Sequence, residues 1–545
     1  MTAVSSGVER REFLRRAGML GVGLSLPSGL LAACGSDAGS GAGTTGGGTR
    51  GGVLSIGATD WLPPDFFLGN SLGPWLLGMS QMAWGLFRGG GGSGRGFELQ
   101  NGLASGYEVS PDGLVHTVRL RRGMVFHDGS PIDADAVVAN LKAAFFARDP
   151  LRDRGTYVQV IITLGSPPIV RSVEAVDPHT VRITLTEARV DIRVALAFLL
   201  IFNPKVLANK DYGTDVQALR DAGSGPFRLT NWQAKSFMEL ERFDRFFEDV
   251  LPDRVRLQGI PDAGALALAA RGGEISVVSG LAKSDFDSLS RTGGHRIVAS
   301  DPAVNVDLVL SKPKDPIFDD ERVRRAILLA MDRQAYTDRF FNSGSAQLSS
   351  EPIIVDGIPG FVPGLQAAPH DTTAARALMA QAGAKSPKLT IAGPTAQAPV
   401  SDFKALMEAI AADLGAIGID ASVDVQDPTA FSDALDHGRV EAFVSAPGGQ
   451  ADPFILFDLF YRGPYMPGAT HTVPSIARNL DAAHKARTAG ERDRLLQQVM
   501  RDTVDRQLVL PISWVAYSVL ADGKVTDFPL TCTQLDSWHR VSVST

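Results

Sequence analysis

The stretch that decides the fold is Leu103-Ala104-Ser105-Gly106-Tyr107-Glu108-Val109-Ser110-Pro111-Asp112-Gly113-Leu114, continued in Arg119-Leu120-Arg121-Arg122-Gly123-Met124-Val125-Phe126-His127-Asp128-Gly129-Ser130-Pro131. Glycines beside polar residues mark turns at 112–113, 122–123 and 127–129. Residues 114–120 are rich in β-forming side chains and predict a strand. After Asp133 the apolar spacing becomes helical, and Asp133 is the expected N-cap.

The same alternation of strands and helices recurs along the chain. Strands are predicted at 53–57, on both sides of Asp177-Pro178 within 173–185, and at 419–425. Helices are predicted at 320–333, 402–414 and 490–506, with a further helix-like segment at 79–87. The pattern predicts an α/β protein built in several lobes.

The first 33 residues look like an export signal. Arg10-Arg11-Glu12-Phe13-Leu14-Arg15-Arg16 resembles a twin-arginine motif, and a short apolar stretch with several glycines follows it. Leu31-Ala32-Ala33-Cys34 is similar to a bacterial lipobox, which predicts lipidation at Cys34; the alternative is an ordinary signal peptide with an incidental cysteine. Residues 34–52, mostly small and polar, are expected to form a flexible tether.

Composition and motifs narrow the function classes. The formal charge of −7 disfavours nucleic acid as a partner. The sequence lacks the C-x-x-C, H-E-x-x-H and G-x-S-x-G motifs, and its nine histidines show no metal-ligand spacing. We therefore expect no catalytic residues, no metal site and no cofactor.

Two further segments join the opening stretch. One is Gly223-Ser224-Gly225-Pro226-Phe227 with Trp232; the other is Phe318-Asp319-Asp320-Glu321-Arg322-Val323-Arg324-Arg325-Ala326-Ile327 with Ala330-Met331-Asp332-Arg333. In this order, the three segments resemble family 5 of the bacterial extracellular solute-binding proteins, the peptide/nickel/opine class of ABC importers. Beside this resemblance, a physical reading gives Asp319, Asp320 and His127 scaffold roles as caps and turn residues.

The resemblance implies an α/β, periplasmic-binding-protein-like fold (type II, cluster C) with two lobes and an extra domain. The implied divisions are a signal peptide at 1–33, the tether at 34–52, a discontinuous lobe I from 53–85, 223–300 and 511–545, the extra domain at 86–222, and lobe II at 301–510.

The implied function is that of a lipid-anchored substrate-binding component of an ABC importer. Such a protein captures a small molecule or peptide between its lobes and delivers it to permease subunits at the outer face of the cytoplasmic membrane. The resemblance therefore implies that the protein is not an enzyme. An exported hydrolase or other enzyme, and a signalling or chaperone lipoprotein that works without an importer, stay open as alternatives.

The ligand-binding residues are predicted from the resemblance and from residue type. In peptide-binding members an acidic residue precedes an Asp-Pro step by three positions; here that position is Gly449, before Asp452-Pro453, and Ala446 replaces a common aromatic residue. This change puts an ammonium–carboxylate pair with a peptide in doubt. Because ligand pockets are largely apolar with a few polar groups, the candidate ligand-binding residues are Trp61, Trp84, Gly449, Gln450, Asp452 and Trp514.

Overall fold

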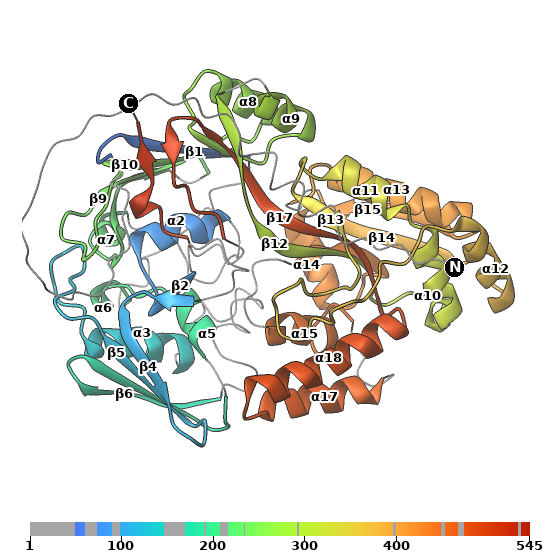
Figure 1. The fold of residues 1–545 in the computed structure, drawn as a ribbon, viewed down its shortest axis with the longest axis horizontal. Coiled ribbons are helices and arrows are strands. Elements are labelled where there is room, and N and C mark those ends of the chain that lie inside the picture. Colours follow the sequence, from blue (N-terminus) through green and yellow to red (C-terminus); the bar gives the residue numbers. More distant parts are fainter. Residues whose placement is uncertain are drawn as a thin grey trace, which may run out of the picture. The chain divides into compact units, whose positions relative to one another are not determined.

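The computed structural model describes residues 49–59, 74–89, 99–146, 169–189, 192–207, 216–233, 235–291, 294–395, 399–447, 453–466, 473–531 and 536–544. Mixed sheets and helices alternate along these residues, so the predicted α/β class is confirmed (Figure 1).

The largest element is an eleven-stranded mixed sheet. Its main path runs β15 (Asp420–Gln426), β14 (Lys388–Pro394), β16 (Ala442–Ser445), β12 (His295–Leu310), β17 (Val509–Asp522), β11 (Val277–Ser279), β1 (Val53–Ala58), β10 (Arg254–Gly259), β9 (Phe237–Arg242) and β8 (Phe227–Gln233), and β13 (Ala346–Leu348) pairs with β17. β1 is parallel to β10 and β11, and β14 is parallel to β15 and β16. The two long strands β12 and β17 pair antiparallel at the middle of this sheet.

A separate antiparallel sheet has the order β4 (Ala104–Val109), β5 (Val115–Leu120), β7 (Thr180–Leu185) and β6 (Val170–Asp177). Two small sheets pair β2 (Phe87–Gly89) with β3 (Leu99–Asn101) and β18 (Val525–Thr526) with β19 (Ser542–Val543). The strands predicted at 114–120 and within 173–185 are therefore confirmed, and the structure shows that they lie in one sheet.

The helices in the described residues are α2 (Pro74–Met82), α3 (Ala134–Phe146), α5 (Arg193–Phe198), α6 (Pro204–Leu207), α7 (Val216–Arg220), α8 (Ala263–Arg271), α9 (Lys283–Arg291), α10 (Glu321–Ala330), α11 (Arg333–Phe340), α12 (Thr372–Ala382), α13 (Phe403–Ala416), α14 (Pro428–Asp436), α15 (Pro453–Tyr461), α17 (Pro474–Lys485) and α18 (Ala489–Asp505). Short 3₁₀ turns are η2 (Pro316–Asp319) and η3 (Trp538–Arg540). None of the described helices is long and apolar enough to cross a bilayer. α17 and α18 lie side by side (Figure 1).

Two predicted helix spans were wrong in extent. The span 320–333 is two helices, because Met331 is extended and the Asp332 carboxylate caps α11 by accepting from the Ala335 N–H. The span 79–87 stops being helical at Met82, since the backbone of Trp84 donates to the Ser224 hydroxyl instead of continuing the helix.

The buried apolar side chains of the described residues form four clusters, which we group into two cores by the chain segments that they contain. The first core contains residues from 54–289 and from 519–543, and it includes both the β1–β10 part of the large sheet and the separate β4–β7 sheet with α3. The second core contains residues 303–515 in two clusters. Consecutive residues of β12 point to opposite faces of the sheet, so Leu308 lies in one cluster and Val309 in the other. The chain passes between the cores only within β12 and within β17, as far as the described residues show.

Candidate functional site

The passage between the two cores is a pair of irregular strand segments. β12 shifts register between Ala299 and Pro302 and again between Pro302 and Val304. Opposite these residues, the Tyr517 N–H of β17 donates to the Ser300 hydroxyl at 3.0 Å. β-Bulges of this kind bend and twist a strand pair locally. We call residues 299–304 and 515–518 the crossing region.

Just past the crossing region, the side chains of Asn305 and Asp307 enter the second core. The Asn305 amide donates to the carbonyls of Glu351 and Ile354 at 2.8 and 2.9 Å, and the Asp307 carboxyl accepts from the Ile353 N–H at 3.0 Å. Both side chains are at most 1% exposed. Together they hold residues 351–354 against β12, where Ile353 has a φ of 70°, a strained value for a β-branched residue.

Two carboxyl groups of this region are buried. Burial raises the pKa of Asp307 well above its ordinary value. Burial also raises the pKa of Glu351 to about 8, although the Val362 N–H donates to it. Burial therefore favours the protonated, neutral form of both groups. Neither is exposed enough to meet a ligand.

Trp514 is the candidate residue that the structure places nearest to the crossing region. It lies on β17, opposite Asn305 of β12 and Gln347 of β13. Its ring is partly buried against Phe361, with ring centroids 5.7 Å apart. Its indole N–H is buried and has no partner among the described residues, which leaves a donor at the edge of the second core.

Trp84 lies elsewhere. It is 2% exposed and packs edge-on against Phe246 and Phe247 in the first core, with the Arg88 guanidinium 4.5 Å above its ring. This burial favours a packing role. The candidates Cys34, Trp61, Gly449, Gln450 and Asp452 lie outside the described residues. The segment with the last three follows β16, whose Ser445 pairs with Asp307, and Ala446 is buried in the second core.

The segments that carry the family resemblance form scaffold contacts. His127 is buried, its Nε2 is 3.0 Å from the Gly225 carbonyl oxygen, and desolvation lowers its pKa to about 4, so its ring is neutral at neutral pH. Gly223 is required by space, since a Cβ there would lie 2.2 Å from the Met82 carbonyl oxygen. In the third segment, Asp320 caps α10, and Arg333 donates to the carbonyls of Ser349 and Pro511. These contacts support the scaffold interpretation of His127 and Asp320.

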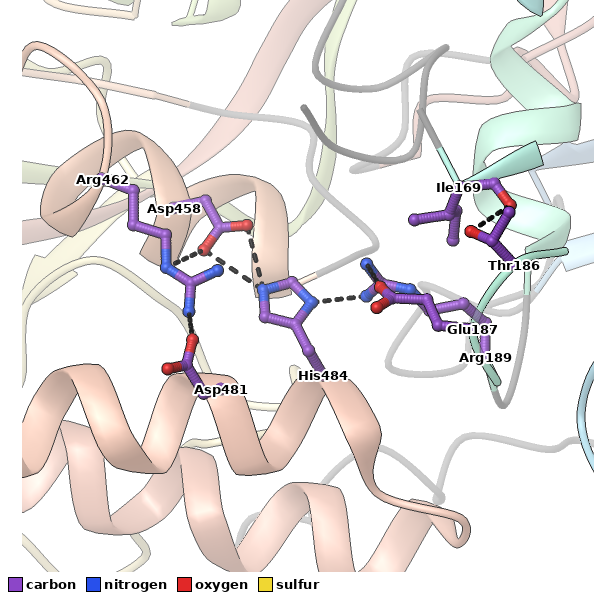
Figure 2. A network of polar contacts seen from close by, with 8 residues as sticks. All are labelled: Ile169, Thr186, Glu187, Arg189, Asp458, Arg462, Asp481 and His484. Atoms are coloured by element: carbon purple, nitrogen blue, oxygen red, sulfur yellow. Dashed lines mark hydrogen bonds and ion pairs between the residues drawn. The ribbon is translucent and has the colours of Figure 1, made fainter. Parts of the chain in front are cut away.

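A polar network that residue patterns did not reveal joins the two cores. Arg189, just after β7, hydrogen-bonds His484 of α17, and His484 contacts Asp458 of α15 at 3.1 Å (Figure 2). Arg189 and His484 are 295 residues apart. No short motif spans such a distance, so the sequence offered no signal for this pairing.

Elsewhere on the surface, a hollow of about 430 Å³ is lined by Gly52, Val53, Glu241, Arg242, Asp244, Asp253 and Arg254. Its charged groups already satisfy one another, as in the Arg242–Asp253 pair at 2.6 Å. Because ligand pockets are largely apolar with few polar groups, we assign this hollow no ligand. The described residues contain no cluster of three or more His, Cys, Asp or Glu side chains that could hold a metal.

Comparisons with known proteins place these features in a family. Residues 98–466 match the family model for bacterial extracellular solute-binding proteins, family 5 middle. The chain is 29% identical over 297 residues to the glutathione-binding protein GsiB of Salmonella paratyphi A, which covers 54% of each chain, so the match spans about half the length of that relative.

Solved structures share the fold. NikA from Brucella suis, in complex with Fe(III)-EDTA, matches with a TM-score of 0.77 at 19% identity, over 90% of this chain and all of that one. The ABC transporter substrate binding protein CtaP from Listeria monocytogenes matches with a TM-score of 0.76 at 19% identity, over 91% of this chain and all of that one. With the family match over residues 98–466, the chain belongs to family 5 of the bacterial extracellular solute-binding proteins.

Proposed function

We propose that this protein is the lipid-anchored substrate-binding component of an ABC importer, capturing a small ligand between two lobes and delivering it to the permease. The observation that carries the proposal is a pair of cores between which the described chain passes only within β12 and β17. Two rigid bodies joined by a short irregular ribbon can close on a ligand by bending at the ribbon. A ligand that contacts both bodies then favours the closed form.

The two cores support a division of the chain into lobes. We assign residues 53–85, 223–300 and 511–545 to lobe I, 86–222 to an extra domain and 301–510 to lobe II. The packing supports a change to one boundary. Because Ile512 and Val515 lie in the second core, we place the point where the chain returns from lobe II to lobe I in the crossing region, at 515–518. The shared first core also means that the extra domain packs on lobe I.

The ligand class is proposed from relatives and from the sequence. The name of GsiB points to glutathione, and the NikA complex points to a metal chelate. Gly449 stands where peptide-binding members carry an acidic residue. A ligand that does not need a carboxylate partner for an amino terminus fits this position best, so metal chelates and opines come before ordinary peptides. Glutathione has a free α-amino group and is proposed from the name of GsiB alone.

A thermal-shift screen tests capture. Purified protein is mixed with glutathione, short peptides, metal chelates, opines and oligosaccharides. A ligand at 100 times its Kd should stabilise the folded state by about 2.7 kcal/mol without being consumed. Strong stabilisation by ordinary peptides of several lengths would contradict the argument from Gly449, and turnover of any compound would favour an exported enzyme.

The anchor has its own test. Lipidation at Cys34, followed by a tether at 34–52, would hold the protein at the outer face of the cytoplasmic membrane. Cys34→Ala should release the protein from the membrane fraction into the soluble exported fraction. Unchanged membrane retention of that variant would overturn the lipid anchor and leave the binding function untouched.

A further inference from the structure

The network around His484 links parts of the chain that belong to different cores. The Arg189 end is fixed to the β4–β7 sheet, since the Arg189 N–H donates to the Gly113 carbonyl at 3.1 Å and Thr186 donates to the Ile169 carbonyl. The His484 end is fixed in α17, whose residues Ile476 and Leu480 are fully buried in the second core. The Arg189–His484 hydrogen bond is therefore a contact between the cores (Figure 2).

The chemistry of this contact fixes the protonation of His484. A guanidinium has only donors, so the Nδ1 of His484 must accept from Arg189. The other ring nitrogen, Nε2, lies 3.1 and 3.3 Å from the Asp458 carboxylate oxygens and donates to them. An imidazole that accepts at one nitrogen and donates at the other carries a single proton and is neutral.

The surroundings hold the ring in this orientation. Phe454 stacks on His484 with centroids 4.0 Å apart, and the side chains of His484 and Arg189 are only 11% and 14% exposed. Three guanidinium groups and three carboxylates lie around this site. The charged groups that face it are Asp458 from α15, Arg462 just after α15, Asp481 from α17, Arg492 from α18, and Glu187 and Arg189 from the segment after β7.

We propose that the Arg189–His484 hydrogen bond is a proton-sensitive latch that holds the two cores together when His484 is neutral. A second proton on the ring binds to Nδ1, the atom that accepts from Arg189. The hydrogen bond is then lost, and two cations face each other across a mostly buried contact. Asp458 keeps its bond to Nε2 in either state, so it fixes the ring without opposing the release. Mild acid opens the latch and separates the cores.

Two substitutions remove opposite halves of the latch. His484→Gln keeps an acceptor for Arg189 and a donor for Asp458 but cannot take a second proton, so it should hold the latch closed at every pH. Arg189→Ala removes the donor and should leave the latch open at every pH. The matched control is His437→Gln. Like His484, His437 pairs with an aspartate, Asp433 at 3.2 Å, but it is exposed at the C-terminal end of α14.

The measurement is energy transfer between two dyes, taken without ligand so that it does not depend on the proposed cargo or its delivery. The dyes are attached to cysteines placed at the exposed residues Glu174 of β6 and Gln498 of α18, in a chain with Cys34 and Cys532 changed to Ser. Between about pH 7.5 and pH 5, the parent protein and His437→Gln should lose transfer. His484→Gln should keep high transfer, and Arg189→Ala should show low transfer at both values.

Circular dichroism at both pH values checks that each variant is folded. The two substitutions lie in different cores and are expected to change the energy transfer in opposite directions. The result from either variant, if it is folded, is therefore enough to test the latch. A pH response of His484→Gln equal to that of the parent would overturn the latch, and so would high transfer in Arg189→Ala at pH 7.5.

Discussion

At the scale of single residues, burial favours the neutral form of several ionisable groups of this protein. Asp307 and Glu351 are fully buried in the second core and His127 is buried in the first, and each makes hydrogen bonds to backbone groups. Burial of a charge without a partner costs far more than burial of the neutral form. These residues therefore organise backbone segments, and their protonation couples the stability of the protein to pH.

Glu351→Gln should remove one part of that pH dependence. The pKa of Glu351 is raised from 4.5 to about 8, so the folded protein binds one proton more than the unfolded chain between these values. The stability that the neutral group provides is present below pH 4.5 and is lost as pH rises to 8. The variant should match the parent in mild acid and exceed it at pH 8 by on the order of a few kcal/mol.

Denaturant unfolding across this pH range measures the difference. Glu174→Gln, at an exposed position of β6, is the control and should follow the parent at every pH. Parallel curves for Glu351→Gln and the parent would show that the carboxyl of Glu351 is ionised in the folded protein.

Two Gly→Ala substitutions distinguish the effect of a steric clash on stability from the effect of glycine's backbone freedom. Gly223→Ala would push a methyl group against the Met82 carbonyl oxygen and the His127 ring, so it should cost about 3 kcal/mol. Gly415→Ala, at an exposed site of α13 with no atom within 4 Å of the added methyl, should stabilise by about 0.5–1 kcal/mol. Melting temperatures should therefore shift in opposite directions, and a neutral Gly223→Ala would mean that the 223–227 segment can move away from α2.

At the scale of elements, short polar contacts decide where helices begin and end. Carboxylates cap α10, α11, α12 and α13, each by accepting from an N–H of the first turn. The cap at Asp332 divides a continuous apolar pattern into two helices. The apolar spacing alone could not reveal this division, since it runs through both helices without a break.

Asp320→Ala tests such a cap. Its carboxylate accepts from the Arg322 N–H at 2.8 Å, and its loss should lower the free energy of unfolding by about 1 kcal/mol. Asp319→Ala removes the neighbouring exposed carboxylate, which is not the cap, and should change the stability by less than half as much. Urea unfolding of both variants makes the comparison, and equal losses would mean that general charge, not capping, stabilises α10.

At the scale of the whole described chain, two cores share one sheet through β12 and β17. A continuous sheet transmits force between the cores, and the register shifts of β12 concentrate bending at residues 299–304. Hinges of this kind absorb their motion in a few residues at the ends of elements. The latch at His484 and the bend in the crossing region therefore act on the same motion, which is the movement of one core relative to the other.

A ligand found in the screen should compact the protein. Small-angle X-ray scattering at saturating ligand should give a smaller radius of gyration than the ligand-free protein, because the ligand favours the closed form. A compound from the screen that does not stabilise the protein is the control. An unchanged radius with a stabilising ligand would place the ligand within one core.

The α/β class, the family and the strands and helices with a regular apolar pattern could be predicted from the amino-acid order alone, because apolar periodicity and turn glycines act over a few residues. Asp133 and Asp320 were recognisable as caps for the same reason, and both accept from N–H groups of their helices. Only the tertiary structure decided that Trp84 is packed in the first core, that Trp514 lies beside the crossing region, and that Arg189 meets His484. These facts depend on which distant segments the sheet brings together, and burial, which sets the pKa of Glu351 and His127, exists only after that assembly.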